Sequence, residues 1–319
     1  MRVLVTGGAG YIGSHMVRTL ELGGHHVVVV DDLSSGHADA VPKSVPLVRA
    51  DVRDREAVTH AIRTHKLTAL FHFASRIQVG ESVVHPRLYY RDNLAAGVAL
   101  LDIALDAGIH ELILSSTAAV YGNPIRTPID EDHPKAPVNP YGATKLALEG
   151  MLEAYAAAYD FKYAALRYFN AAGADTGLGE RHDPETHLIP LVLDAASGAR
   201  PSLRVFGDDY ATPDGTCVRD YIHVSDLAAA HLAALDYLTR GGPSGAFNLG
   251  TGKGQSVREV IACVEKVTGK KVPTVMGPRR AGDPPELVAS PEKAKRVLGW
   301  EAKRSSLEEI VSDAWRARG

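Results

Sequence analysis

The 319-residue sequence is poor in several features, and each shortage excludes a class of protein. Its two cysteines, Cys217 and Cys263, are too few and too far apart for a disulfide framework or a cysteine-based metal site. No apolar run approaches the roughly 20 residues that a membrane helix needs. The net charge of −3 provides no attraction for nucleic acid or an anionic membrane. With the first predicted strand starting at residue 2, no signal peptide is expected. We therefore expect a cytoplasmic protein without nucleic-acid or membrane partners.

The first half of the chain alternates short apolar runs with helical stretches. Continuous apolar strands separated by helices predict parallel strands that are buried on both faces of a sheet. We therefore predict an α/β fold, a Rossmann doubly wound parallel sheet. The predicted strands are Val3–Val5, Val27–Val30, Pro46–Val48, Leu70–Phe73 and Leu112–Leu114.

This alternation ends after residue 170, where Ala171 to Pro184 has the composition of a loop. We predict a dinucleotide-binding domain over residues 1–170, rejoined by segments around 216–238, and a smaller, mixed α/β substrate-binding domain over 171–319. Helix signals continue in the second half. Ser256 and Glu259 form a capping box before an apolar stripe, and Gly269 follows as the expected helix end.

A glycine-rich stretch, Thr6-Gly7-Gly8-Ala9-Gly10-Tyr11-Ile12-Gly13, lies between the first strand and a helical run. Gly8, Gly10 and Gly13 fit the G-x-G-x-x-G spacing, and Gly7, Gly10 and Gly13 fit a three-residue spacing. Such glycines permit a tight turn, close approach of a pyrophosphate and close helix packing, although a plain glycine-rich turn is the simpler alternative. Asp31 ends the second strand, where a carboxylate meets the adenosine ribose. A carboxylate at that position favours NAD over NADP.

Tyr141 and Lys145 are four positions apart, so that they share one face of a helix. A tyrosine with a pKa near 10 is a poor base, but a neighbouring ammonium group lowers that pKa. Such a phenol can exchange a proton with an alcohol while hydride moves to a nicotinamide. The same spacing is common on surface helices, and the preceding nucleotide-binding motif is what favours catalysis here.

Thr117 ends the fifth predicted strand, and ligands of open α/β sheets bind beyond such strand ends. We therefore predict that its hydroxyl is the partner of Tyr141 at the reacting oxygen. Ser115 is expected only to bond local backbone. The histidines that invite attention show no convincing metal spacing, so no metal site is expected. These are His15, His25, His26, His72 and His223.

Over nearly its whole length the sequence resembles the extended short-chain dehydrogenase/reductase family, and within it the UDP-sugar 4-epimerases. The arginine-containing stretches of the second half carry the narrower resemblance. The matching segments are Thr6–His15, His72–Ala74, Val79–Ser82, Ser115–Gly122, Tyr141–Lys145, Leu166–Asn170, Val205–Gly207, Gly215–Val224, Asn248–Gly250 and Pro278–Asp283.

The resemblance implies a mechanism in which UDP-galactose and UDP-glucose are interconverted at the sugar C4. Tyr141 would take the proton of O4 while hydride passes to tightly bound NAD. The 4-keto sugar would then rotate and receive the hydride on its other face. Lys145 would lower the tyrosine pKa and hold the nicotinamide ribose, and Thr117 would bond the sugar O4.

The resemblance also implies two sets of binding residues and a homodimer. Asp92 and Ile77 stand where bacterial relatives carry asparagine and lysine, and His187 stands where they carry asparagine. Arginine suits the diphosphate because guanidinium pairs bidentately with phosphate. The implied cofactor residues are Gly7, Gly10, Tyr11, Ile12, Gly13, Asp31, Asp51, Val52, Phe73, Ala74, Asp92, Thr117, Tyr141, Lys145 and Phe169. The implied substrate residues are Thr117, Tyr141, Asn170, His187, Leu188, Phe206, Arg219, Arg280 and Asp283.

The residues bear on three alternatives to this activity. Leu287 at the implied size gate of the sugar pocket is intermediate in size, so UDP-N-acetylglucosamine or UDP-glucuronate stays open as the substrate. A nucleotide-sugar 4,6-dehydratase would need an acid after Thr117, where this chain has Ala118 and Ala119. A catalytically silent dinucleotide sensor is disfavoured because the Tyr141–Lys145 pair is intact.

Overall fold

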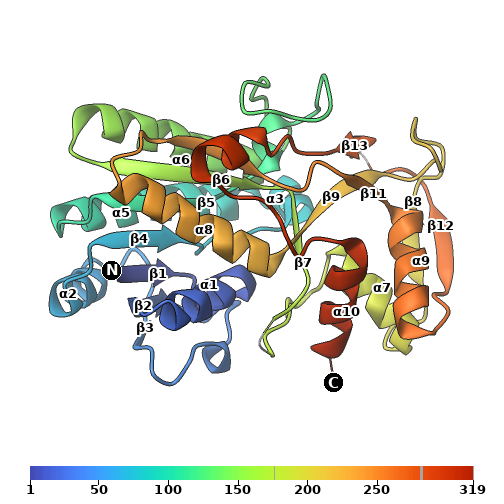
Figure 1. The fold of residues 1–319 in the computed structure, drawn as a ribbon, viewed down its shortest axis with the longest axis horizontal. Coiled ribbons are helices and arrows are strands. Elements are labelled where there is room, and N and C mark those ends of the chain that lie inside the picture. The colour runs from blue at the N-terminus through green and yellow to red at the C-terminus, as the bar shows by residue number, and fades with distance from the viewer. Residues whose placement is uncertain (176, 281–282, 319) are drawn as a thin grey trace.

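The computed structural model describes residues 1–175, 177–280 and 283–318, and a parallel sheet of seven strands forms its centre (Figure 1). The strand order is β10-β6-β5-β4-β1-β2-β3, with every neighbouring pair parallel. The chain winds outward in both directions from β1, which confirms the doubly wound Rossmann prediction. The strands are β1 (Arg2–Thr6), β2 (His26–Asp31), β3 (Leu47–Arg49), β4 (Ala69–His72), β5 (Glu111–Thr117), β6 (Lys162–Tyr168) and β10 (Gly245–Leu249).

Helices cover both faces of this sheet. Val3 and Val5 pack with α1 and α8 on one face, whereas Leu4 packs with α2, α5 and α6 on the other. Each fully buried valine or leucine contributes about 1.5–3 kcal/mol to stability. The elements of this region are α1 (Tyr11–Leu22), η1 (Ala38–Ala40), α2 (Arg55–His65), α3 (Val79–Val84), α4 (Pro86–Tyr89), η2 (Tyr90–Ala95), α5 (Ala96–Asp106), η3 (Ala118–Tyr121), α6 (Pro140–Ala158) and α8 (Val224–Thr239).

The remainder of the second half forms a smaller mixed α/β layer around its own apolar cluster, on the right of Figure 1. Strand β9 pairs in parallel with β7 and β13 and antiparallel with β11, and β12 pairs with β8. The elements are β7 (Asn170–Ala172), α7 (Leu188–Ser197), β8 (Leu203–Phe206), β9 (Val218–His223), β11 (Gly254–Ser256), α9 (Val257–Thr268), β12 (Thr274–Gly277), β13 (Glu286–Leu287), η4 (Ala294–Leu298) and α10 (Leu307–Arg316).

The predicted start and end of α9 are confirmed. Ser256 Oγ accepts from Glu259 N at 3.1 Å, and Glu259 Oε2 accepts from Ser256 N at 2.6 Å. Gly269 follows in the left-handed conformation, with φ 68°. The predicted loop from Ala171 is wrong at its start, because β7 pairs there with β9. Within the described residues, no helix is long and apolar enough to cross a membrane.

The predicted domain boundary near residue 170 stays a proposal. The segment that rejoins the large sheet contains α8 and extends through β10, beyond the predicted 216–238.

Candidate active site

Tyr141, the predicted acid–base residue, lies in the first turn of α6. Asn139 caps this helix by accepting from Gly142 N at 2.8 Å, and Pro140 occupies the first turn, where its missing N–H is tolerated. These local signals start the helix so that Tyr141 meets the end of β5. There the Thr117 side chain lies close enough to the Tyr141 hydroxyl to act on its pKa as a hydrogen-bond partner. The structure thus brings together the two hydroxyls that were predicted to share the reacting oxygen.

Lys145 lies one turn further along α6 and is fully buried. Its Nζ donates to Ser75 Oγ at 3.0 Å and to Ser115 O at 2.8 Å. Burial lowers the pKa of Lys145 to about 7, although the nearby Glu149 carboxylate opposes this shift. The backbone carbonyl of Ser115 therefore takes part in the site, which the sequence did not predict.

The prediction that Lys145 lowers the pKa of Tyr141 is wrong for this structure. Removal of the phenol from water raises the Tyr141 pKa to about 12, and the hydrogen bond from Thr117 only partly opposes this. Lys145 is not among the groups that shift it, because its ammonium group is turned toward Ser75 and Ser115. At neutral pH the phenol is protonated.

The glycine turn forms a cradle that leaves no room for side chains. A Cβ on Gly7 would lie 2.4 Å from Ala74 N, and one on Gly13 would lie 2.1 Å from Gly7 O. Gly7 has φ 73°, a conformation that glycine adopts without strain. Gly10 caps α1 without a side-chain hydrogen bond, so the first N–H groups of the helix remain available to an anion. These residues fit the pyrophosphate of a dinucleotide.

The buried carboxylate of Asp31 lies beside this cradle, at the end of β2. It accepts from Ala9 N at 2.9 Å and from Leu33 N at 2.9 Å. Burial raises its pKa, and the two backbone hydrogen bonds oppose the shift. These bonds fix the carboxylate at the carboxyl edge of the sheet, where the ribose was predicted to lie.

The other predicted cofactor residues fall into two environments. Val52 is buried, and the Phe73 ring packs against His231 with centroids 5.0 Å apart. Asp51 pairs with Arg53 at 2.5 Å. Asp92 is engaged by two arginines, which the sequence did not predict: Arg91 at 2.6 Å and Arg76 at 2.7 Å. Hydrogen bonds from these arginines lower the pKa of Asp92 to about 2.

The predicted diphosphate residues gather on the smaller layer. The Arg280 guanidinium lies 4.6 Å from the centroid of the Phe206 ring. Arg219 on β9 forms an ion pair with Asp283. Asn170 on β7 donates to Asp220 O at 3.0 Å, which ties that strand to β9. Residues 281 and 282 of the same motif lie outside the described residues.

Leu287, at the predicted sugar gate, and Phe169 each pack against a small apolar cluster that includes Tyr121. Leu188 is the first residue of α7, directly after His187 at the N-cap. The binding roles of these residues stay predictions, although the fold places them around the same side of the sheet as Thr117.

The sequence did not predict a buried ion pair between α6 and β6. Glu149 on α6 and Arg167 on β6 are joined at 2.6 Å and 3.0 Å. Ser116 Oγ also donates to Glu149 Oε1 at 2.5 Å, and Arg167 Nη1 donates to Tyr121 Oη at 2.7 Å. The available signal was a glutamate four residues after Lys145 on an otherwise buried helix face.

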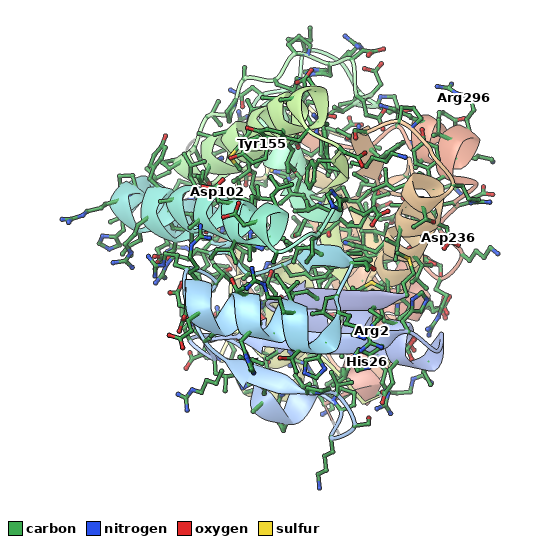
Figure 2. All side chains as sticks on the ribbon, turned by 90° about the vertical axis from the view of Figure 1, so that its left-hand side faces the viewer. Arg2, His26, Asp102, Tyr155, Asp236 and Arg296 are labelled. Carbon is green, nitrogen blue, oxygen red and sulfur yellow. The ribbon has the colours of Figure 1, made fainter. Side chains whose placement is uncertain are left out.

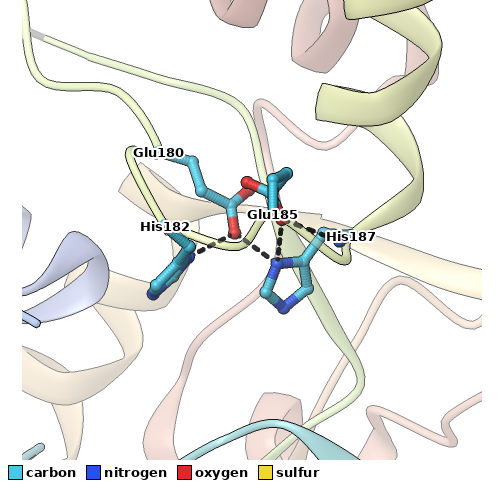
Figure 3. Close-up of side chains that lie close together, drawn as sticks. All are labelled: Glu180, His182, Glu185 and His187. Atoms are coloured by element: carbon cyan, nitrogen blue, oxygen red, sulfur yellow. Dashed lines mark hydrogen bonds and ion pairs between the residues drawn. The ribbon is translucent and has the colours of Figure 1, made fainter. Parts of the chain in front are cut away.

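A second missed group lies in the loop before α7, where Glu180, His182, Glu185 and His187 converge (Figure 3). Nδ1 of His187 lies 2.6 Å from Glu180 and 2.8 Å from Glu185, and Nδ1 of His182 lies 2.9 Å from Glu180. Burial lowers the pKa of His187, but its ion pairs outweigh this and raise it to about 10. The sequence signal was the repeated Glu-x-His pattern of Glu180–His182 and Glu185–His187, which lies outside the five histidines considered above.

Comparison with known proteins identifies the class. The chain matches the NAD dependent epimerase/dehydratase family over residues 3–250 and belongs to that family. Over 317 residues it is 50% identical to the UDP-glucose 4-epimerase of Halalkalibacterium halodurans, covering 99% of this chain and 95% of that protein.

Two solved structures agree with this chain over nearly its full length. The UDP-glucose 4-epimerase of Brucella ovis in complex with NAD superposes with a TM-score of 0.96 at 48% identity, covering 99% of this chain and 97% of that one. The Stenotrophomonas maltophila enzyme with bound NAD and formylated UDP-arabinopyranose superposes with a TM-score of 0.96 at 42% identity, covering 100% and 98%. The cofactor of this NAD-dependent family is thus the one that Asp31 predicted.

Replacement of Gly13 by alanine is expected to abolish NAD retention. The new Cβ would collide with Gly7 O, a backbone atom that cannot move without opening the turn. The measurement is the NAD released from denatured purified protein. Gly150→Ala, on α6 where nothing lies within 4 Å of the added methyl, is the matched control. Equal NAD content in the two variants would contradict the cradle.

Proposed function

We propose that this protein interconverts UDP-galactose and UDP-glucose by inverting the configuration of the sugar C4. The placement of the Tyr141 hydroxyl beside the Thr117 side chain, at the carboxyl edge of a dinucleotide-binding sheet, is the observation that carries this proposal. The relatives named UDP-glucose 4-epimerase, at 46–51% identity, support the same activity.

Thr117, Tyr141 and Lys145 would have different roles when the proton of the sugar O4 moves. Thr117 and Tyr141 would both bond the sugar O4, and Tyr141 would take its proton and later return it. NAD, when bound, supplies the acceptor and donor for the C4 hydride, and its positive charge favours the phenolate. Lys145, anchored by Ser75 and the Ser115 carbonyl, would hold the cofactor ribose.

The opposite end of the substrate would be held by charge. Arg219 and Arg280 would pair with the diphosphate, and Asp283, which binds Arg219 here, would compete for that arginine when no phosphate is present. Inversion requires that the oxidised sugar present its other face. A fixed diphosphate leaves the sugar as the part that rotates.

The proposal also covers the location, the oligomeric state and the domain division of the protein. We propose that it acts in the cytoplasm as a homodimer that pairs through α5 and α6. On the exposed side of these helices Tyr155 Oη donates to Asp102 Oδ1 at 2.8 Å, and Figure 2 labels both residues. We also keep the division into an NAD-binding domain over 1–170 and a UDP-sugar-binding domain over 171–319.

Incubation of the purified protein with UDP-galactose is expected to yield UDP-glucose without added cofactor. Deuterium placed at C4 should stay on the sugar, because the hydride leaves and returns to the same carbon. UDP-N-acetylglucosamine and UDP-glucuronate are tested as alternative substrates, because the intermediate size of Leu287 at the predicted sugar gate leaves them open. Turnover of only UDP-N-acetylglucosamine or only UDP-glucuronate would contradict the proposed substrate. Loss of deuterium to solvent with continued inversion would contradict the proposed mechanism.

A further inference from the structure

We propose that Glu180, His182, Glu185 and His187 form a binding site for one divalent transition-metal ion of the Zn²⁺ class, which orders the loop before α7. One oxygen or ring nitrogen from each of the four side chains lies within 4.8 Å of all the others. The site is separate from the reacting hydroxyls, and it does not depend on which sugar the enzyme takes.

The donor set matches the chemistry of this class of ion. Two imidazoles and two carboxylates supply four ligands, the number found in closed structural zinc sites. Ligand atoms around a tetrahedral zinc lie about 3.4 Å apart, since each is about 2.0–2.2 Å from the metal. The three distances between histidine nitrogen and carboxylate oxygen, 2.6, 2.8 and 2.9 Å, need to lengthen by less than about 1 Å to admit an ion. Mg²⁺ and Ca²⁺, which prefer oxygen ligands alone, fit less well.

The burial of the cluster is uneven, as a site with an entry path requires. The side chains of Glu180 and Glu185 are 6% and 15% exposed, whereas that of His187 is 40% exposed. Glu180 also lines a cavity of about 460 Å³ between this loop and the elements α7 and α10. The carboxylates are thus shielded, and an ion can reach them past His187.

The position of the site gives the ion a structural role. The His182 ring lies 6.4 Å from that of Tyr11, which starts α1, and Tyr11 Oη donates to Gly173 O at 2.6 Å. At its other end the loop leads directly to Leu188, the start of α7. An ion bound to both Glu-x-His pairs would therefore fix the loop that joins the cofactor cradle to the predicted diphosphate side.

Ligation would also set the orientation of His187. Both of its ion pairs use Nδ1, and Nε2 points away from the carboxylates (Figure 3). Metal binding through Nδ1 leaves the Nε2 proton free to donate to an anion. This is compatible with the predicted contact between His187 and the substrate.

The test uses the full chain, stripped with a chelator and titrated with Zn²⁺ against a chromophoric chelator. One Zn²⁺ per chain is expected, with a rise in the melting temperature and an X-ray absorption shell of nitrogen and oxygen that includes histidine. His182→Ala and the conservative Glu185→Gln should each weaken binding by at least about tenfold. Circular dichroism of the metal-free variants verifies folding.

The matched control is His65→Ala. It removes the His26–His65 pair, whose ring nitrogens lie 3.2 Å apart and which belongs to no group of three or more possible metal ligands among the described residues. This control should leave Zn²⁺ affinity unchanged. Absence of stoichiometric binding, equal affinity for Mg²⁺, or binding that survives His182→Ala and Glu185→Gln would each overturn the proposal.

Discussion

Replacing Tyr141 with phenylalanine is expected to lower kcat by about 10²–10⁴-fold, the range that a positioned acid–base group contributes. The variant keeps the ring, which packs edge-on against Tyr89 with centroids 6.4 Å apart, and loses only the hydroxyl that meets Thr117. The fold and the NAD content should therefore stay as in the parent. The measurement is turnover of UDP-galactose together with the NAD content of the same preparation.

Tyr155→Phe is the matched control for this experiment. Tyr155 lies on the same helix, α6, but its hydroxyl donates to Asp102 on α5, away from Thr117 (Figure 2). Its loss should leave turnover within about twofold, since no proton of the reaction passes through it. Comparable activities of Tyr141→Phe and Tyr155→Phe would remove Tyr141 from the role of acid and base.

Arg167→Met is expected to lower the free energy of unfolding by about 3–5 kcal/mol, because it leaves the Glu149 carboxylate buried without its partner. The side chains of Arg167 and Glu149 are only 3% and 7% exposed, so water cannot replace the lost charge. Tyr121 would lose a hydrogen-bond donor as well. Urea unfolding at neutral pH, with the denaturant slope compared to the parent, measures the effect.

Lys266→Met serves as the control for a lost ion pair. Lys266 and Glu308 are joined at 2.7 Å, but their side chains are 69% and 60% exposed, and such pairs contribute little. A shift of less than about 1 kcal/mol is expected there. If Arg167→Met were no more harmful than Lys266→Met, the buried pair would not stabilise the fold. Glu149→Leu combined with Arg167→Met should recover part of the loss, since no unpaired charge remains.

Much of the cofactor half could be predicted because its signals are local. The apolar strands, the glycine turn and Asp31 follow one another within about one βαβ unit, and each needs only its neighbours to take its conformation. The start of α6 is similar, since Asn139 and Pro140 set it from within the chain. The capping box of Ser256 and Glu259 is complete within four residues.

The electrostatics of the site could not be predicted in the same way. The Tyr141–Lys145 spacing indicated a lowered phenol pKa, yet the structure shows a raised one. Burial depends on how the whole molecule packs, so the spacing of two residues along one helix cannot predict its effect on a pKa. The ammonium group of Lys145 is directed by Ser75, which is 70 residues away in the chain. Asp92 likewise forms an ion pair with a residue outside its own helix, Arg76.

The sequence by itself determined five strands of the large sheet, the helix ends, the glycine cradle and the residue types at the reacting centre, because backbone conformation and hydrophobic pattern act over a few residues. It did not predict β6 or β10. Only the tertiary structure decided which charges meet. Arg167 reaches Glu149 across two elements, and Arg219 reaches Asp283 from 64 residues away. Such pairs form where packing excludes water, and that exclusion exists only once the sheet and its helices have closed around them.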